Sequence, residues 1–416
     1  MMSRQCGPIA YLAQVFPSLT QTFVYREVLA LRERGVSVHT FSIWPSDPAD
    51  LSAEAVPLTE ETFYIFPISW FSFAQVHLRY LINRPLRYLG TLAFLLTRPR
   101  EPLRNRWRSL LHFLYGMLAV REIERLKVQH IHAHLGWSAS SIALIANRLL
   151  DVPFSLTLHA GGIYIHRLLL EAKLEHAHFA VTISKYGRQV LRELFPKNGL
   201  EGKIRVVHCG LDPDVFIPAR KHPRSDDEDE LVIVGVGRLD PCKGFHILIE
   251  ACHHLAKRGI PFRCHILGEG EERSRLEGLI DRYQLEDHVL LHGQVHQEEL
   301  RQMLNRVDVS ALPCIRAKNG EVDNIPVVLM ETMAMQIPTV STRVSGIPEL
   351  IDHERNGLLV LSGDAVALAD ALQRLEESPE WRQQLGKAGR ETVVNEFNIY
   401  RSAEQMCRLF EQKDVR

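Results

Sequence analysis

The sequence has no long apolar run and almost no net charge, and both absences narrow the protein's function. No segment reaches roughly 18 uninterrupted apolar residues, the usual mark of a membrane-spanning helix. No apolar run precedes Pro8, so we expect no signal peptide. The formal net charge of −1 provides no global field to attract nucleic acid, and we expect no nucleic-acid partner.

Signals for disulfide bonds are also missing. The seven cysteines are dispersed along the 416 residues without a Cys-x-x-Cys pair. An odd, scattered set favours reduced thiols and therefore a cytoplasmic protein.

What the sequence does contain is a regular alternation of short runs typical of strands, many of them apolar, and segments with helical periodicity. The runs lie at 9–15, 36–43, 130–134, 154–159 and 180–184, and again at 231–237, 262–267, 289–292, 307–312 and 339–342. Strands that alternate with helices predict parallel, doubly wound sheets. We therefore predict an α/β fold with two Rossmann-like domains, which the chain length also favours.

An acidic segment at 221–230 separates the two series and is typical of a linker. We expect a first domain at 1–215, a second at 216–395, and a helical tail at 396–416. Ser18 and Gln21 have the spacing of a capping box before the first predicted helix.

Residues 62–120 interrupt the first domain with a different composition. The segment is rich in aromatic residues from Phe63 to Tyr115 and in arginines from Arg79 to Arg108, and Glu101 is its only acid. Aromatic helices with a basic flank indicate an interfacial surface for a membrane, such as the inner leaflet of the cytoplasmic membrane. A packed helical insertion whose arginines stay in solvent fits the same pattern, and both interpretations stay open.

The first strand of the second domain is followed by Gly237-Arg238-Leu-Asp240-Pro-Cys-Lys243-Gly244. Asp240 stands where a dinucleotide fingerprint needs its third glycine, which disfavours a dinucleotide oxidoreductase. The turn instead places Arg238 and Lys243 at the carboxyl end of a strand, where ligands bind in such sheets. Two cations there would neutralise a departing diphosphate. The alternative is a turn with ordinary surface charges.

Two carboxylates, Asp323 and Glu331, flank a predicted helix start with Pro326 in its first turn. The free N–H groups of such an end suit anions and polyhydroxylated groups. The alternative for Asp323 is a helix N-cap.

Two further strand ends carry glycine turns, Leu267-Gly268-Glu-Gly270 and His292-Gly293-Gln294-Val295. Glycine allows a ligand ring to approach the backbone closely, although it also simply ends strands.

Taken together, these motifs resemble those of retaining nucleotide-sugar glycosyltransferases of the GT-B fold, family 4, also called glycosyl transferases group 1. The resemblance rests on the G-R-x-x-x-x-K-G spacing and the acid pair, and it is strongest from 204 to 360. The segment 16–22, Phe-Pro-Ser-Leu-Thr-Gln-Thr, is similar to the exopolysaccharide branch of that family. Asp323 departs from the usual Glu, and Gln336 stands at a usual Gly.

The resemblance implies two domains that face a central cleft, with the tail packing back on the first domain. It implies that Glu331 holds the ribose hydroxyls and that Asp323 faces the donor sugar. The amides of Asn324, Ile325 and Val327 would contact sugar and phosphate oxygens, while Gly237 and the two glycine turns would line the nucleotide.

In the first domain, the resemblance implies that His159 hydrogen-bonds the reacting sugar or the phosphate; a structural histidine is the alternative. His132 and His134 share a strand face, but we find no third ligand with supporting spacing and predict no metal site. His134 is a candidate for the acceptor cleft. Ser18, Thr20 and Thr22 are further acceptor-binding candidates; helix capping is their other interpretation.

The resulting hypothesis is a retaining glycosyltransferase that moves a hexose from a UDP- or GDP-sugar to a glycan or lipid-linked acceptor in exopolysaccharide biosynthesis. No metal or other cofactor is expected, because Arg238 and Lys243 would stabilise the diphosphate. A GT-B sugar-nucleotide epimerase and an inactive sugar-nucleotide-binding protein are the alternatives. The sequence leaves the base, the sugar, the acceptor and the oligomeric state open.

Overall fold

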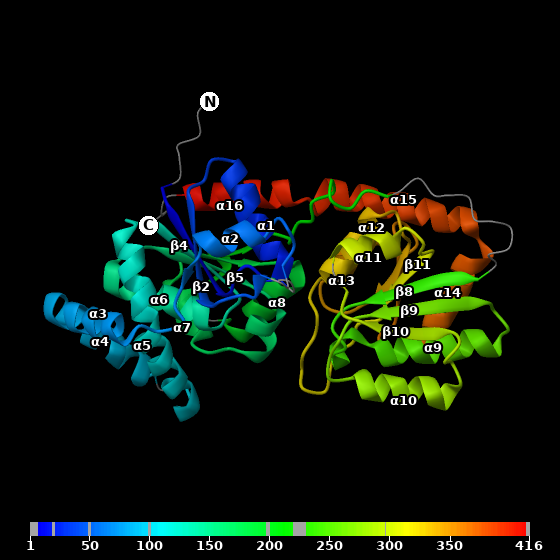
Figure 1. Ribbon diagram of the computed structural model, residues 1–416, viewed down its shortest axis with the longest axis horizontal. Coiled ribbons are helices and arrows are strands. Elements are labelled where there is room, and N and C mark those ends of the chain that lie inside the picture. Colours follow the sequence, from blue (N-terminus) through cyan, green and yellow to red (C-terminus); the bar gives the residue numbers. More distant parts are fainter. Residues whose placement is uncertain are drawn as a thin grey trace. The chain divides into compact units, whose positions relative to one another are not determined.

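The computed structural model describes residues 7–18, 21–48, 51–98, 101–196, 200–218, 230–295 and 297–412 (Figure 1). The chain divides into two compact units, one up to residue 208 together with the residues from 399 onward, the other spanning Cys209–Asn398. The second unit begins at Cys209, earlier than the domain boundary predicted after residue 215, because Leu211 and Phe216 are buried in its core. Leu211 also pairs with Asn398 in an isolated bridge.

The first unit contains a seven-stranded parallel sheet in the order β3-β2-β1-β4-β5-β6-β7. Its strands are β1 Ile9–Val15, β2 Val38–Trp44, β3 Phe63–Tyr64, β4 His130–His134, β5 Phe154–Leu158, β6 Phe179–Thr182 and β7 Ile204–Val206. Alternate residues of β1 enter different apolar clusters: Ile9 and Tyr11 pack with α1 Thr22–Glu33 and α16 Ile399–Glu411, while Ala10 and Leu12 pack with α5 Leu103–Arg125 and α6 Ser138–Leu150. Helices therefore cover both faces of the sheet.

The remaining helices of this unit include those of the segment 62–120, which was predicted to interrupt the first domain. They are α2 Val56–Glu61, α3 Trp70–Asn83, α4 Pro85–Leu96, α7 Leu170–His176 and α8 Lys185–Leu194, with the short turns η3 Gly161–Ile165 and η4 Leu200–Gly202. The helices α3, α4 and α5 pack on one another beside α6 (Figure 1). The tail helix α16 belongs to this unit and packs against α1.

The second unit has a six-stranded parallel sheet in the order β10-β9-β8-β11-β12-β13. Its strands are β8 Leu231–Val236, β9 Phe262–Leu267, β10 Val289–Gly293, β11 Val309–Leu312, β12 Thr339–Thr342 and β13 Leu358–Val360. Its helices are α9 Phe245–Lys257, α10 Arg273–Tyr283, α11 Gln297–Leu304, α12 Val327–Ala334, α13 Ile347–Leu350, α14 Ala365–Glu377 and α15 Pro379–Glu396, with the turn η5 Pro241–Lys243. One apolar cluster fills this unit.

These two sheets confirm the predicted fold of two parallel Rossmann-like domains. The strands β1, β4, β9 and β12 have the predicted bounds, whereas β3, β7 and β13, with two or three residues each, are too short to leave a pattern. The predicted capping box is wrong: α1 begins at Thr22 after Gln21, and no side chain caps it. Among the described residues, none of the helices combines the length and apolar character needed to cross a bilayer.

Candidate active site

The carboxyl ends of β8 and β9 approach each other through glycines in the second unit. Gly237 follows β8 with a φ of 155°, and Gly268 follows β9 with a φ of 148°. A Cβ on Gly268 would lie 1.9 Å from the carbonyl oxygen of Gly237, so no other residue fits there. This contact fixes the loop that carries Arg238 and Lys243.

Gly244 fixes the same loop from the other side. It has a φ of 73°, and a Cβ there would lie 2.0 Å from the carbonyl oxygen of Pro313. Pro313 directly follows β11, so the end of η5 is pressed against the end of a neighbouring strand. Both glycines of the sequence motif therefore serve close backbone contacts, and Lys243 lies between them.

Lys243 and Asp323 are brought together at this strand end. Lys243 Nζ donates to Asp323 Oδ2 at 2.5 Å, and both side chains are largely shielded from solvent. Burial alone would lower the pKa of Lys243, but the Asp323 carboxylate outweighs burial and raises that pKa above its usual value. Lys243 is thus a permanent cation held by an acid that is distant in sequence.

Arg238 has a different partner. Its guanidinium pairs with Asp240 Oδ2 at 2.8 Å and is 62% exposed. In the sequence, Asp240 served only as an argument against a dinucleotide site. In the structure, it orients Arg238, the second cation of the motif. A surface pair of this kind is weak and exchanges readily for a stronger anion.

Asp323 is not a helix N-cap, and this excludes its alternative interpretation. The N-cap of α12 is Pro326, which was predicted in the first turn but lies one residue before it, and no side-chain hydrogen bond caps the helix. Asp323 Oδ1 instead accepts from the backbone N–H of Asn324 at 2.9 Å. The amide Nδ2 of Asn324 is buried without a hydrogen-bond partner among the described residues. Such a group is costly unless a ligand satisfies it.

The other predicted donor-binding residues lie in the same unit. Ile325 and Glu331 are buried, and Val327 opens α12. Gly293 has a φ of 79°, and its carbonyl accepts from Gly268 N at 2.7 Å. The two glycine turns are therefore adjacent, with the loop residues Gln294 and Val295 following directly.

Gln336, at the position of the usual glycine, has a left-handed φ of 59°. This conformation favours glycine and explains why one is usual there. Although it is not a glycine, Gln336 adopts this left-handed backbone conformation.

In the first unit, His159 follows β5 and is almost fully buried. Its ring lies 4.6 Å from that of Phe23, and its Nε2 has no hydrogen-bond partner among the described residues. Burial, and secondarily His134, lowers the pKa of His159 well below its usual value, so the ring is neutral at pH 7. A neutral ring with one open nitrogen suits a hydrogen bond, and the role of His159 stays a prediction.

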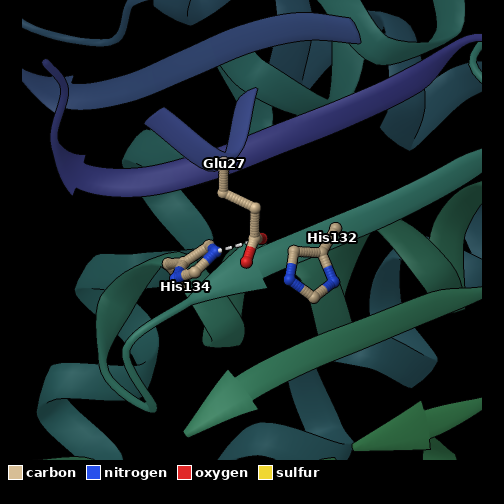
Figure 2. Close-up of side chains that lie close together, drawn as sticks. All are labelled: Glu27, His132 and His134. Atoms are coloured by element: carbon tan, nitrogen blue, oxygen red, sulfur yellow. Dashed lines mark hydrogen bonds and ion pairs between the residues drawn. The ribbon is translucent and has the colours of Figure 1, made fainter. Parts of the chain in front are cut away.

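His134 is held by an acid that the sequence analysis missed. Its Nε2 lies 3.1 Å from Glu27 Oε1 (Figure 2). The Tyr11 hydroxyl donates to the same carboxylate oxygen. A carboxylate only accepts, so the contact with Glu27 places a proton on His134 Nε2. No local signal identifies Glu27, because it lies on α1 and meets β4 only through the fold.

Glu27, His132 and His134 also form a candidate metal-ligand set, since their ligand atoms lie within 4.8 Å of one another (Figure 2). The fold thus supplies a third possible ligand, Glu27, which the spacing in the sequence did not indicate. Both ring nitrogens of His132 already contact hydroxyls, Ser155 Oγ at 2.8 Å and Thr157 Oγ1 at 3.0 Å. Coordination by His132 would break one of these contacts, so the residues suit a hydrogen-bonded cluster better than a metal site.

Among the acceptor candidates, Thr22 begins α1, and the backbone carbonyl of Ser18 accepts from Gln21 N at 3.3 Å. Thr20 lies outside the described residues.

Comparison with known proteins covers both units. The family described as Glycosyltransferase Family 4 matches residues 20–215, and the family described as Glycosyl transferases group 1 matches residues 218–392. The chain is 41% identical over 197 residues to the putative colanic acid biosynthesis glycosyltransferase WcaL of Escherichia coli K12; that match covers 47% of this chain and about half of the relative (48%). It is 28% identical to the amylovoran biosynthesis glycosyltransferase AmsK of Erwinia amylovora, over 97% of this chain and 99% of the relative.

Among solved structures, Anabaena Alr3699/HepE in complex with UDP-glucose is similar in fold. Its TM-score is 0.69 at 17% identity, with 97% of this chain and 98% of the other covered.

Proposed function

The chain belongs to the glycosyltransferases of the GT-B fold, and from this premise we propose that it is a retaining enzyme that uses a nucleotide diphosphate sugar. We propose a hexose on UDP or GDP as the donor, and the UDP-glucose in complex with the Anabaena protein supports the UDP form. The acceptor in this proposal is a glycan or a lipid-linked glycan. The names of the colanic acid and amylovoran relatives support a step in exopolysaccharide biosynthesis.

The single observation that carries the donor proposal is the pair that Lys243 of η5 forms with Asp323, in the segment before α12. A diphosphate would compete for the cation of Lys243, because its charge is larger than that of one carboxylate. Asp323 would then be released to accept a hydrogen bond from a sugar hydroxyl. Arg238, which is held only by an exposed contact with Asp240, would add a second positive charge.

In the proposed reaction, the bond between the anomeric carbon and the diphosphate oxygen breaks. The acceptor hydroxyl oxygen bonds to the same face of that carbon, and its proton leaves with the diphosphate. The two cations stabilise the charge that develops on the leaving group, which is why we propose that no divalent metal is needed.

We place the reaction on the cytoplasmic side of the inner membrane. Among the described residues, Cys242, Cys252, Cys264 and Cys314 are buried thiols that form no disulfide, which fits a reducing compartment.

The test is a panel of labelled UDP- and GDP-sugars incubated with the purified protein, with and without membrane extract as the acceptor source. We expect nucleotide release that depends on the acceptor and persists in EDTA. The variant Lys243→Met should lose at least about 100-fold in transfer rate, whereas Lys257→Met, an exposed lysine at the end of α9, should keep full activity. The double variant Lys243→Met/Asp323→Asn removes the unpaired acid and controls for misfolding.

Other outcomes contradict the proposal in distinct ways. Release of nucleotide and an altered sugar without acceptor would identify an epimerase. Binding of a sugar nucleotide without turnover on any acceptor would identify an inactive binding protein. Normal transfer by Lys243→Met would show that the donor phosphate binds elsewhere.

A further inference from the structure

The helices α3, α4 and α5 carry most of the exposed apolar surface of the described residues. Among all the described residues, seventeen large apolar side chains are exposed, and ten of them lie on these three helices. We call these ten residues the apolar patch: Trp70, Phe71, Leu78, Leu81, Ile82, Leu86, Leu89, Leu103, Trp107 and Leu111. Single exposed apolar residues are normal, but ten of them on three helices that pack on one another indicate an interaction surface.

The patch is not the core face of the three helices. Each helix already buries another face: Val76 and Tyr80 on α3, Leu95 on α4 and Phe113 on α5. The apolar residues of the patch are thus additional to those that hold the helices on the sheet. This observation disfavours the simpler interpretation of a packed insertion with a polar outer face.

The first turns of α5 show how apolar and basic residues are arranged. Leu103, Trp107 and Leu111 follow one another at intervals of four residues, which aligns them along one side of the helix. Arg104 and Arg108 form a parallel row beside them, and both are exposed. Among the described residues, neither arginine forms an ion pair.

The other arginines of the segment are used differently. Arg79 and Arg84 pair with Glu124 on the same unit, at 3.0 and 2.8 Å. The single acid of the segment, Glu101, is also occupied, because it accepts from the backbone N–H of Leu169 at 2.8 Å. The apolar patch is therefore flanked on α5 by two exposed arginines, Arg104 and Arg108, which pair with no acid in the part of the chain that the structure describes.

We propose that the apolar patch docks on the surface of a membrane that contains anionic lipids. Tryptophan and phenylalanine side chains are suited to the interface between headgroups and acyl chains, and arginines bind lipid phosphates. No described helix is able to span the bilayer, so the attachment is interfacial.

A second copy of the chain is a poorer occupant, because a self-complementary contact would bring rows of arginine together without an opposing acid. The inference concerns the same unit as the acceptor candidates, but it does not depend on the donor chemistry.

The test is flotation of the full-length protein with liposomes of phosphatidylcholine alone or of phosphatidylcholine mixed with the anionic phosphatidylglycerol. We expect binding to the anionic liposomes at low salt that weakens as salt screens the arginines. The variant Arg104→Glu/Arg108→Glu should reduce that binding about tenfold or more. Leu103→Ser/Trp107→Ser should weaken it at every salt concentration, and the matched control Leu290→Ser/Leu361→Ser, at two exposed leucines of the second unit, should not.

Three results would overturn the inference. The first is no binding of the wild type to anionic liposomes at low salt. The second is equal binding by the arginine variant. The third is a dimer in analytical ultracentrifugation that Leu103→Ser/Trp107→Ser dissociates, which would show that a second copy covers the patch. Affinity for the sugar nucleotide should be the same in the wild type and all three variants, so failure of the membrane inference is distinguishable from failure of the donor proposal.

Discussion

The first unit buries four histidines where β4 and β5 run side by side, whereas no described histidine of the second unit is buried. His130, His132, His134 and His159 are neighbours of serine and threonine hydroxyls, of Glu27 and of one another. The second unit instead holds a lysine and an aspartate at a strand end, partly open to solvent. Histidine tolerates burial because it is able to stay neutral, while a fixed charge needs a partner.

The two units thus use polar side chains differently in the same type of sheet: the first buries histidine rings, and the second holds an ion pair. The histidine seam, formed by these four residues, ties the stability of the first unit to pH. In the Lys243–Asp323 pair, by contrast, the partner carboxylate raises the pKa of Lys243 above its usual value. Four predictions test the contrast, from the largest expected effect to the smallest.

The first prediction concerns the paired acid of the second unit. Asp323→Asn should lower kcat/KM by about 100-fold to 1,000-fold, equivalent to roughly 3–4 kcal/mol, because it removes the proposed contact with the sugar hydroxyl and loosens Lys243. Asp240→Asn, which alters only the exposed Arg238 pair, should cost less than about tenfold. Steady-state kinetics with the donor found in the panel measures both. Equal losses in the two variants would remove the distinction between the pairs.

The second prediction concerns the backbone that positions Lys243. Gly244→Ala should destabilise the second unit by about 3 kcal/mol, because the new Cβ meets Pro313 in addition to a left-handed φ. Gly259→Ala is the matched control, with a φ of 70° and no atom within 4 Å of the added Cβ, and should cost only about 1 kcal/mol. Urea unfolding measures both changes. A similar cost at the two sites would show that the contact with Pro313 is easily relaxed.

The third prediction concerns pH. Burial, with a smaller effect of His178, lowers the pKa of His130 to about 3 from its usual value near 6.5. The folded state therefore binds fewer protons, and the free energy of unfolding falls as the pH drops below 6.5, down to about 3. At pH 5 the loss from His130 alone is about 2 kcal/mol.

Hydrogen exchange of the full-length protein at pH 7 and pH 5, corrected for intrinsic rates, separates the two units. Amides of β4 and β5 should lose more protection at pH 5 than those of β8 and β11, because burial lowers the pKa of His130 far, to about 3, whereas His265 of the second unit is only partly buried. Equal loss in both sheets would contradict a role for the buried histidines.

The fourth prediction concerns one hydroxyl of the histidine seam. Ser155 Oγ contacts both His130 Nε2 and His132 Nδ1, at 2.7 and 2.8 Å. Ser155→Ala leaves these ring nitrogens without that partner and should cost about 1–3 kcal/mol. Ser341→Ala, at an equally buried serine of the second unit that donates only to the Leu312 carbonyl, should cost about 1 kcal/mol. Thermal unfolding compares them, and a larger cost at Ser341 would contradict the prediction.

Much of the fold is readable from local pattern. The strands β1, β4, β9 and β12 are predicted to the residue, because short runs that alternate with helical segments are typical of a parallel sheet. The start of α1 is not readable in this way: Ser18 and Gln21 have capping-box spacing, yet no side chain caps the helix. Helix starts depend on loop geometry that a four-residue pattern does not encode.

In the candidate site too, some features are predictable from the sequence and others are not. Gly237, Gly244 and Lys243 are recognisable by their spacing, because the turn after a strand must meet fixed steric demands. That Lys243 contacts Asp323, or that Asp240 holds Arg238, does not follow from the spacing. The acid Glu27 carries no signal at all, since nothing near it in sequence suggests a histidine partner.

By itself, the sequence determined the two parallel sheets, the family resemblance and the chemical types of the residues at the strand ends. Strands, helices and turns depend on residues that are close in sequence, so local periodicity and turn chemistry are sufficient to predict them. Only the tertiary structure decided which charges meet, that Glu27 joins His134, and that the outer faces of α3 to α5 stay apolar and exposed. These outcomes depend on packing between segments far apart in the chain, where no fixed spacing links the partners.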